Sequence, residues 1–300
     1  MGFINVFVGS ECSLKLKNNQ LFLTKKDGGS VDYPIEDINS VLVENQLSVV
    51  SIQCLNKLVE NNVIVYLCDE KHLPSAYVLG YNSFYKNLMV YNYQTQVPKP
   101  VQKQIWKNII IQKIKNQVKV LDILKIDNGL DAYISQIKSG DSDNTEGVVA
   151  GKYFRCLFGN DFIRRDDNLI NSALNYGYAI IRGAIARSAV AHGLQPYIGV
   201  HHCNMLNNFN LVDDLIESFR PLVDLFVYTN IAKLQVTELD TKLKQKLHSL
   251  LVYDVQMESG TYDVSTAIDM VVSSLVSAMK NKQSIIKLPN ILNLKVHAYE

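Results

Sequence analysis

The 300-residue sequence has no apolar run near the roughly 18 to 20 residues that cross a bilayer. Its start, MGFINVFVG, lacks the basic segment and apolar core of a secretory signal, so we expect a cytoplasmic protein without a membrane segment. The five cysteines are an odd number and include no Cys-x-x-Cys pair. This pattern argues against a disulfide framework and a structural zinc ribbon, and we expect reduced thiols.

The sequence also lacks a strong net charge, which is +1 at pH 7. An even spread of charge would disfavour a nucleic-acid partner, but residues 76–138 carry nine lysines against three acidic residues. Lys99, Lys103 and Lys107 recur every four residues and would form one stripe on a helix. Such a stripe is either a solvated helix face or a surface for DNA phosphates, and charge patterning leaves both interpretations open.

The first eighty residues consist of short β-rich runs broken by Asn, Asp and Gly, which predict a small antiparallel sandwich. Asn18 and Asn19 mark a hairpin turn, and residues 48–62 have the apolar spacing of one short helix. After Tyr81 the sequence changes to long helix-forming runs. The expected fold class is therefore α+β, with a β-sandwich domain at 1–78, a linker at 79–98 and a larger all-α domain at 99–300.

Helices in the second part follow from apolar periodicity and from end signals. Asn144 or Thr145 would cap one of them and place Glu146 in its first turn. Another is dense in Ala and Gly, which predicts a buried central helix that ends at Gly193. The expected helices lie at residues 101–124, 145–159, 168–193, 237–253 and 264–281.

Residues 171–224 place imidazoles beside paired carboxylates, which is how a metal site is built. Asp213, Asp214 and Glu217 lie three or four residues apart on one predicted helix, so at least one pair shares a face. His201 and His202 lie just upstream, in a segment rich in Gly and Pro. The residues alone do not decide between the two histidines.

Several of these candidates also have structural explanations. A first-turn glutamate such as Glu146 is favoured by the helix dipole in any protein. Asp213 would occupy the third helical position after a cap at Asn210, as half of a capping box. Cys203 beside His202 could suggest a thiol nucleophile, but adjacent residues rarely point at each other.

Three separated motifs add a resemblance to these candidates. They are Glu146-Gly147 ahead of Tyr153-Phe154, a histidine two residues before Asn204 and the run 209–211, and DLIESFRP at 214–221. In this order they resemble CRISPR-associated protein 1, the integrase that inserts new spacers into CRISPR arrays, and most closely its type II branch. The resemblance covers essentially the whole chain. Ser218 departs from the Pro that many type II members have, and no chemistry depends on it.

The resemblance implies that Glu146, His202 and Glu217 are the catalytic metal ligands, and it selects His202 over His201. It makes Asp214 a supporting acid and places Asn175 and Tyr176 of the ALNYGYA motif next to the site. Two carboxylates and one imidazole favour Mg²⁺ or Mn²⁺ over structural zinc. Nearby cations could bind DNA phosphates or form ion pairs; they are Lys152, Arg155, Arg164, Arg165, Arg182, Arg187 and Arg220.

The implied reaction is a transesterification in which the 3′-hydroxyl of a prespacer attacks the CRISPR repeat next to the leader. The implied partners are double-stranded DNA, a second copy of the chain bound through the N-terminal domains, and CRISPR-associated protein 2 in a heterohexamer. A DNA-end-binding ring protein and the effector nuclease are further expected partners of a prokaryotic type II system. Two alternatives remain: a stand-alone metal-dependent DNA nuclease, and a non-catalytic DNA scaffold.

Overall fold

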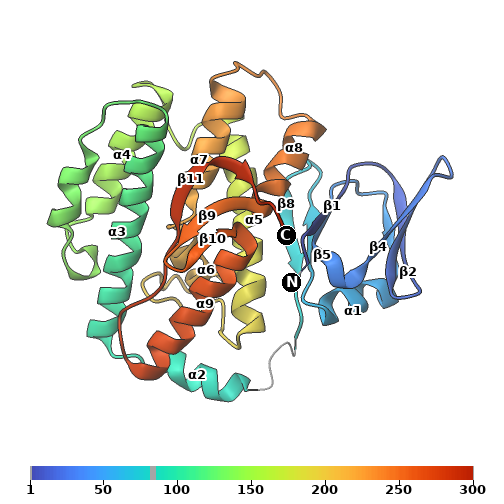
Figure 1. Cartoon of the computed structure of the whole chain (residues 1–300), viewed down its shortest axis with the longest axis horizontal. Helices are drawn as coiled ribbons and strands as arrows, with labels where there is room; N and C mark the ends of the chain where they lie inside the picture. Colours follow the sequence, from blue (N-terminus) through green and yellow to red (C-terminus); the bar gives the residue numbers. More distant parts are fainter. Residues whose placement is uncertain (1, 82–85, 300) are drawn as a thin grey trace.

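The computed structural model describes residues 2–81 and 86–299. Figure 1 shows the β-rich first part of the chain (blue) on one side and the helices (green to red) on the other. The expected α+β class is confirmed. Within these described ranges, none of the helices combines the length and the apolar character that a membrane crossing requires.

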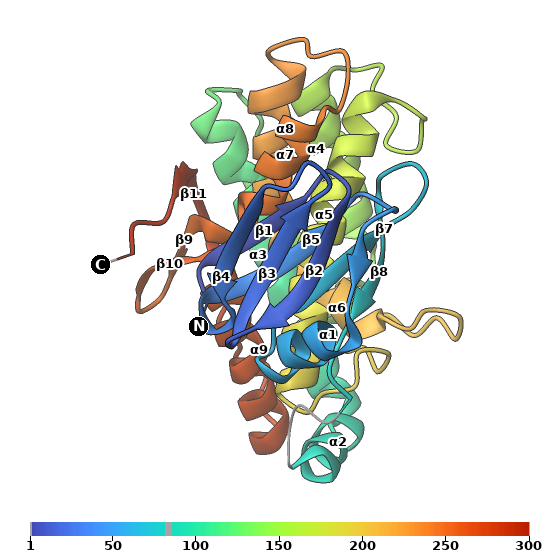
Figure 2. The same ribbon diagram turned by 90° about the vertical axis from the view of Figure 1, so that its right-hand side faces the viewer.

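The N-terminal part contains two four-stranded sheets, and Figure 2 shows the second sheet in front of the first. The order of the first is β1-β5-β7-β8, and the order of the second is β4-β3-β2-β6. An apolar core that includes Leu14, Leu21 and Val41 joins the two sheets. The strands are β1 (Ile4–Val8), β2 (Cys12–Lys17), β3 (Gln20–Lys25), β4 (Ser30–Pro34), β5 (Ile38–Val43), β6 (Val49–Val50), β7 (Ile64–Cys68) and β8 (Pro74–Val78).

The expectation of a wholly antiparallel sandwich is wrong for the first sheet, because β1, β5 and β7 run parallel. Parallel neighbours need a crossover, and helix α1 (Ile52–Glu60) lies in the connection between β5 and β7. Every residue of β5 is buried, as is typical of a strand that is covered on both faces. The hairpin between β2 and β3 is confirmed, with Asn18 and Asn19 at φ 51° and 59°, the positive values that a tight two-residue turn requires.

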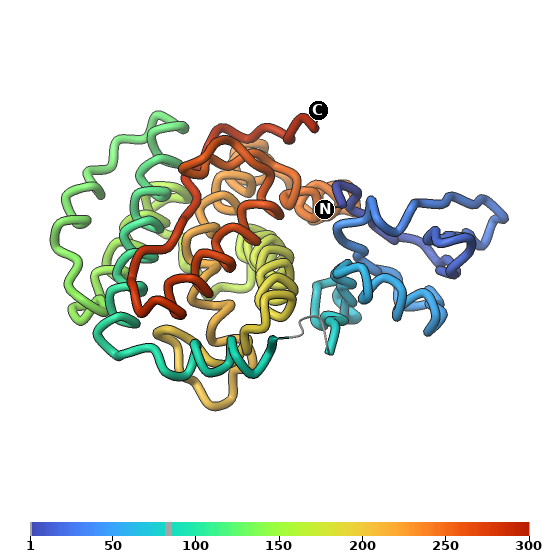
Figure 3. The backbone as a smooth tube through the Cα atoms, turned by 60° about the horizontal axis from the view of Figure 1, so that its bottom comes forward, coloured from blue at the N-terminus to red at the C-terminus, as the bar shows by residue number. Residues whose placement is uncertain are grey.

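Helix α5 forms the centre of the second part, and Figure 3 looks nearly along its axis (yellow). It also packs against the first sheet: Tyr66 of β7 donates a hydrogen bond to the carbonyl of Ile180 at 2.6 Å. A Cβ at Gly183 would lie 2.4 Å from the Tyr66 ring, so only glycine allows this approach. The helices are α2 (Asn87–Thr95), α3 (Lys99–Ile123), α4 (Thr145–Phe158), α5 (Leu169–Ala191), α6 (Asn210–Ile216), α7 (Arg220–Val227), α8 (Thr241–His248) and α9 (Val264–Asn281).

The second part is not all-α, which corrects that detail of the expectation. A small sheet of order β10-β9-β11 lies beside α9, formed by β9 (Tyr253–Met257), β10 (Gly260–Asp263) and β11 (Asn290–Val296). Short 3₁₀ segments lie at Ile35–Asp37, Leu130–Gln136, Ser139–Asp141 and Ser249–Val252, and a π-helical turn lies at Tyr228–Ala232. The rings of Phe3 and Tyr299 are 5.5 Å apart, so the two ends of the described chain meet.

Helix α2 lies inside the segment that we expect to be a linker at 79–98. Residues 82–85 of that segment lie outside the described residues. Strand β8 ends at Val78 and α3 begins at Lys99. The division into domains at these positions stays a prediction.

Candidate active site

One buried carboxylate, that of Asp214 on α6, holds the loop that carries the histidines. Its Oδ2 accepts hydrogen bonds from the backbone N–H of Val200 at 2.5 Å and of His201 at 3.0 Å. Its Oδ1 lies 3.1 Å from the backbone nitrogen of His202 and 2.7 Å from Nδ1 of the same residue. A Cβ at Gly199 would come within 2.2 Å of the His202 carbonyl oxygen, so glycine is needed for this tight loop. Because Nδ1 is engaged, Nε2 is the ring nitrogen that His202 has left for a ligand.

The two histidines have different surroundings. His201 stacks on Trp106 with ring centroids 4.2 Å apart and an interplanar angle of 1°. Burial lowers the pKa of His201, whereas the hydrogen bond to Asp214 raises the pKa of His202. Asp214 therefore orients the ring of His202 through Nδ1. This supports the choice of His202 as the ligand, which is the histidine that the family motif selects.

Glu146 and Glu217 come together although they lie in separate segments of the chain. Lys113 on α3 donates to Glu146 Oε1 at 2.5 Å and also to Glu217 Oε2. Glu146 lies in the first turn of α4, as expected. The helix start is capped differently from the expectation, since the carboxylate of Asp141, and not Asn144 or Thr145, accepts the backbone N–H groups of residues 145 and 146. The result is a pair of carboxylates from separate segments around one cationic group.

Glu217 lies in the turn between α6 and α7, so the expected single helix across Asp213, Asp214 and Glu217 ends earlier than predicted. Phe219 donates its N–H to the carbonyl of Ile216 in a tighter turn, and Pro221 lies in the first turn of the next helix, where its missing N–H is tolerated. The expected cap at Asn210 is also wrong: Asn210 is already the first helical residue, and its side chain ties the loop at Tyr197 and Asn204.

Arg220 completes the charge balance of the cluster. Its Nε donates to Glu217 Oε1 at 2.7 Å, and its guanidinium lies 4.5 Å from the centre of the Tyr178 ring. Burial would raise the pKa of Glu217, but Arg220 and Lys113 outweigh burial, and the pKa is lowered. Tyr178 in turn donates to Asp224, whose pKa burial raises to about 6. Glu217 is thus held as an anion inside the protein.

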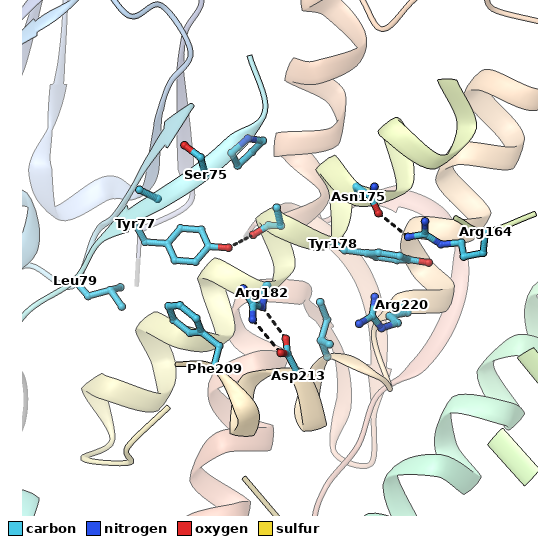
Figure 4. Close-up of a pocket in the computed structure, with 14 residues that line it drawn as sticks. Ser75, Tyr77, Leu79, Arg164, Asn175, Tyr178, Arg182, Phe209, Asp213 and Arg220 are labelled. Carbon is cyan, nitrogen blue, oxygen red and sulfur yellow. Dashed lines mark hydrogen bonds and ion pairs between the residues drawn. The ribbon is translucent and has the colours of Figure 1, made fainter. Parts of the chain in front are cut away.

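A cavity of about 530 Å³ lies between β8 and helices α5, α6 and α7 (Figure 4). Three arginines line it. Arg182 makes a two-pronged ion pair with Asp213, at 2.7 and 2.9 Å, and Arg164 donates to Asn175 at 2.7 Å. Asp213 therefore pairs across the cavity, and does not serve in a capping box as expected. Arg220 joins this cavity to the carboxylate cluster.

The remaining predicted residues are placed as follows. The structure does not bring Tyr176 to the cluster: its side chain is fully buried, and Cys68, Glu44 and Tyr66 of the β-rich part are its electrostatic neighbours. Lys99, Lys103, Arg155 and Arg165 are exposed, while Lys107 is half-buried. Lys152 is exposed and contacts Tyr133, and Arg187 is buried against Asn39 and Asp269.

The donor types of Glu146, Glu217 and His202 fit a hard or borderline divalent cation. Among residues 2–81 and 86–299, however, no three His, Cys, Asp or Glu side chains are grouped so as to hold a metal. Two of the three expected ligands converge, but on the ammonium of Lys113, and the third is held on Asp214. His202 is close enough for Glu217 to contribute to its raised pKa. The donor chemistry therefore fits the metal, while a lysine holds the position between the carboxylates.

Sequence reasoning missed Lys113 and Trp106. A signal for Lys113 was available, because it shares the apolar face of α3 with Ile109, Ile110 and Ile114, which are fully buried. Lysine is almost never fully buried unless it is paired. A lysine at a core position of a periodic helix therefore indicates a buried acid elsewhere in the chain.

The fold of this chain is shared with solved structures of other proteins. A solved casposase bound to its integration product has a TM-score of 0.78 and 19% identity, covering 95% of this chain and 92% of the casposase. A chain of a Cas6-RT-Cas1–Cas2 complex has a TM-score of 0.71 and 18% identity, and the match covers 94% of this chain and 35% of the longer one. At these identities the likeness shows the fold alone.

The family follows from the sequence. A family model described as CRISPR associated protein Cas1 matches residues 6–254. A protein of Neisseria meningitidis named CRISPR-associated endonuclease Cas1 is 37% identical over 292 residues, which are 96% of each chain. The chain belongs to the Cas1 family, and the resemblance read from the three motifs is confirmed.

Proposed function

We propose that the protein is a metal-dependent DNA integrase of CRISPR adaptation, in which a prespacer 3′-hydroxyl attacks the CRISPR repeat by transesterification. The observation that carries this proposal is the convergence of Glu146 and Glu217, from separate segments, on one cation position. Membership of the Cas1 family and the fold shared with an integrating casposase support it.

The side chains have separate tasks in this proposal. A bound Mg²⁺ or Mn²⁺, held by Glu146, Glu217 and Nε2 of His202, would stabilise charge that develops on the attacked phosphate. Asp214 orients the ring of His202, because the carboxylate fixes Nδ1 and the surrounding backbone. Arg220 keeps Glu217 ionised. No covalent protein nucleophile is required, because the attacking group is a DNA hydroxyl.

The DNA would cross the face that carries the cations. Lys99 lines a second cavity, of about 510 Å³, together with His202. Arg164 and Arg220 lie on either side of the first cavity's Tyr178 and could contact phosphates beside the acidic cluster. Arg182 already pairs with Asp213, so we expect it to hold α5 and α6 together at the cavity and not to bind DNA.

The proposed assembly is a homodimer through the β-rich part, with two dimers on the small partner Cas2. Three large apolar side chains, Leu47, Val49 and Ile52, are exposed next to α1 and suit such a protein contact. The Cas6-RT-Cas1–Cas2 complex with the same fold supports the Cas2 partnership. The DLIESFRP motif supports placement in the type II branch.

The reaction type is tested with DNA whose attacking end is blocked. We expect a dideoxy-ended fragment to bind normally but to give no joined product, because transesterification needs the 3′-hydroxyl. Glu146→Ala and Glu217→Ala should lose joining with normal ends. The name of the Neisseria relative, an endonuclease, favours a nuclease as the second candidate. If dideoxy ends were still joined, or if hydrolysed DNA were the only product, the nuclease would replace the integrase.

The choice of histidine is tested in the same assay. His202→Ala should abolish Mn²⁺-dependent joining, because it removes the imidazole that Asp214 orients. His201→Ala is the matched control and should keep most activity, although it loses the stacking on Trp106. The reverse result would show that His201 is the ligand.

A further inference from the structure

Lys113 is a buried cation in a place where a lysine is costly. Its side chain is 8% exposed, and its ammonium reaches carboxylates from two different segments, Glu146 and Glu217. A buried charge that is not paired strongly destabilises the protein. The lysine is therefore stable in this position only while both carboxylates stay near it.

The charges of the four side chains that pair directly in the cluster cancel. Lys113 and Arg220 carry two positive charges, and Glu146 and Glu217 carry two negative charges. A divalent cation added to this balanced group would leave an excess of two positive charges in a largely buried site. Such an excess is unfavourable in a medium of low dielectric unless another anion enters.

The geometry sets a second constraint. A divalent cation binds carboxylate oxygens at roughly 2.0 to 2.6 Å. The ammonium nitrogen already lies 2.5 Å from Glu146 Oε1 and in contact with Glu217 Oε2. Two cations cannot share these oxygens from the same side, so the ammonium must leave when a metal enters between the two carboxylates.

The anions around the cluster already accept hydrogen bonds from other groups. Asp214 already accepts from three backbone N–H groups and contacts His202 Nδ1. Asp141 accepts two backbone N–H groups at the start of α4, and Asp224 accepts from Tyr178. A phosphate group of the incoming DNA supplies the missing negative charge.

We propose that Lys113 is the resident cation of the Glu146–Glu217 pair, that a divalent metal must displace it, and that the displaced ammonium then pairs with a DNA phosphate. The DNA half of this inference rests on the proposed function. The consequence is reciprocal: metal binding strengthens DNA binding, and DNA strengthens metal binding, through one side chain.

The metal half is tested without DNA, by titrating Mn²⁺ into the full chain in a calorimeter. Lys113→Met keeps the length of the side chain and removes the charge, and we expect it to bind Mn²⁺ roughly tenfold more tightly than the unaltered protein. Lys115→Met, an exposed position on the same helix, is the control and should not change the affinity. Unchanged or weaker Mn²⁺ binding in Lys113→Met would overturn the proposal, because Lys113 would then align the carboxylates and not compete with the metal.

The DNA half is tested by repeating the titration with dideoxy-ended DNA, which binds but cannot be joined. The unaltered protein should bind Mn²⁺ several-fold more tightly when DNA is present, and Lys113→Met should show little of this gain. An equal gain in both proteins would overturn the role of the phosphate, while the proposed function is judged separately by the joining assay. If Lys113→Met does not fold, Lys113→Gln replaces it, and Lys113→Arg should restore the weaker Mn²⁺ binding of a site with a resident cation.

Discussion

His248, at the end of α8, should make the stability of this protein fall as the pH is lowered. The ring is 1% exposed, and its Nε2 lies 2.8 Å from Oγ of Ser40 on β5. Ser40 donates its own proton to Asn5 at 2.6 Å, so Nε2 of His248 must carry the hydrogen that Ser40 accepts. The rings of Tyr66 and Phe7 are the nearest aromatic neighbours. A neutral imidazole is therefore enclosed between the first sheet and the helices.

The magnitude follows from the pKa. Burial lowers the pKa of His248 from 6.5 to about 3. Above pH 6.5 the ring is neutral in both the folded and unfolded states and adds no pH dependence. Below pH 6.5 the unfolded chain binds a proton that the folded chain refuses, so stability falls by about 1.4 kcal/mol per pH unit until the folded pKa is reached. Between pH 7 and pH 5 the loss is about 2 kcal/mol.

Urea unfolding in metal-free buffer at pH 7, 6 and 5 measures this loss. His248→Gln should be less stable than the unaltered protein at pH 7, because it loses ring packing, but the gap should narrow by about 2 kcal/mol at pH 5. Leu250→Val removes buried packing but no titratable group, and it should keep a constant gap to the unaltered protein. If the free energy of unfolding fell equally with pH in His248→Gln and the unaltered protein, His248 would not be held neutral and the reasoning would fail.

Three further predictions concern the site and the central helix. Asp214→Asn should cost about 2 to 3 kcal/mol of stability in urea unfolding, because a buried acceptor of several hydrogen bonds loses its charge. It should also weaken Mn²⁺ binding in calorimetry, because His202 loses the carboxylate that orients its ring. Gly177→Ala should destabilise the protein by about 1 to 3 kcal/mol in thermal unfolding, because its Cβ would lie 2.4 Å from a Val223 methyl group. Gly151 has open space around it, so the control Gly151→Ala should be neutral or stabilising. Alanine replacement of the lysine stripe, which consists of Lys99, Lys103 and Lys107, should make DNA binding less salt-dependent. In a fluorescence titration, the slope of log affinity against log salt concentration should become shallower by about one unit per lost phosphate contact. An unchanged slope would show that the stripe is a solvated surface.

The sequence predicted best the elements whose pattern is local. Helix α9 has the expected bounds of 264–281, and α5 is the buried central helix. The Asn18-Asn19 turn was readable because positive φ at two adjacent residues restricts the choice of residue. These features depend on neighbours within a few positions, and such neighbours are visible in a single sequence.

Features that depend on distant neighbours were missed or misplaced. The parallel pairing of β1, β5 and β7 depends on a crossover, and no residue within those strands encodes it. Asp213 could be a capping residue by its position, but Arg182 lies 31 positions away and reaches it across the cavity. Glu146 and Glu217 could be named from motifs, whereas their contact through Lys113 required the fold. Spacing predicts which side chains share a helix face, and it does not predict what another helix brings to that face.

Asp213, Asp214 and Glu217 show how partners from other helices separate the roles of neighbouring acids. Asp213 and Asp214 are adjacent, so about 100° of helix rotation separates them, and they cannot serve one partner. Asp214 points to the histidine loop and Asp213 to Arg182. Continued helix geometry would put Glu217 within about 40° of Asp213, facing the cavity. The backbone of Glu217 is still helical, with φ −55° and ψ −37°, but its side chain bonds to Lys113 and to Arg220. The acid that stabilises the cavity wall and the acid that can serve as a ligand are therefore distinguished by the cations that α5 and α3 bring to them.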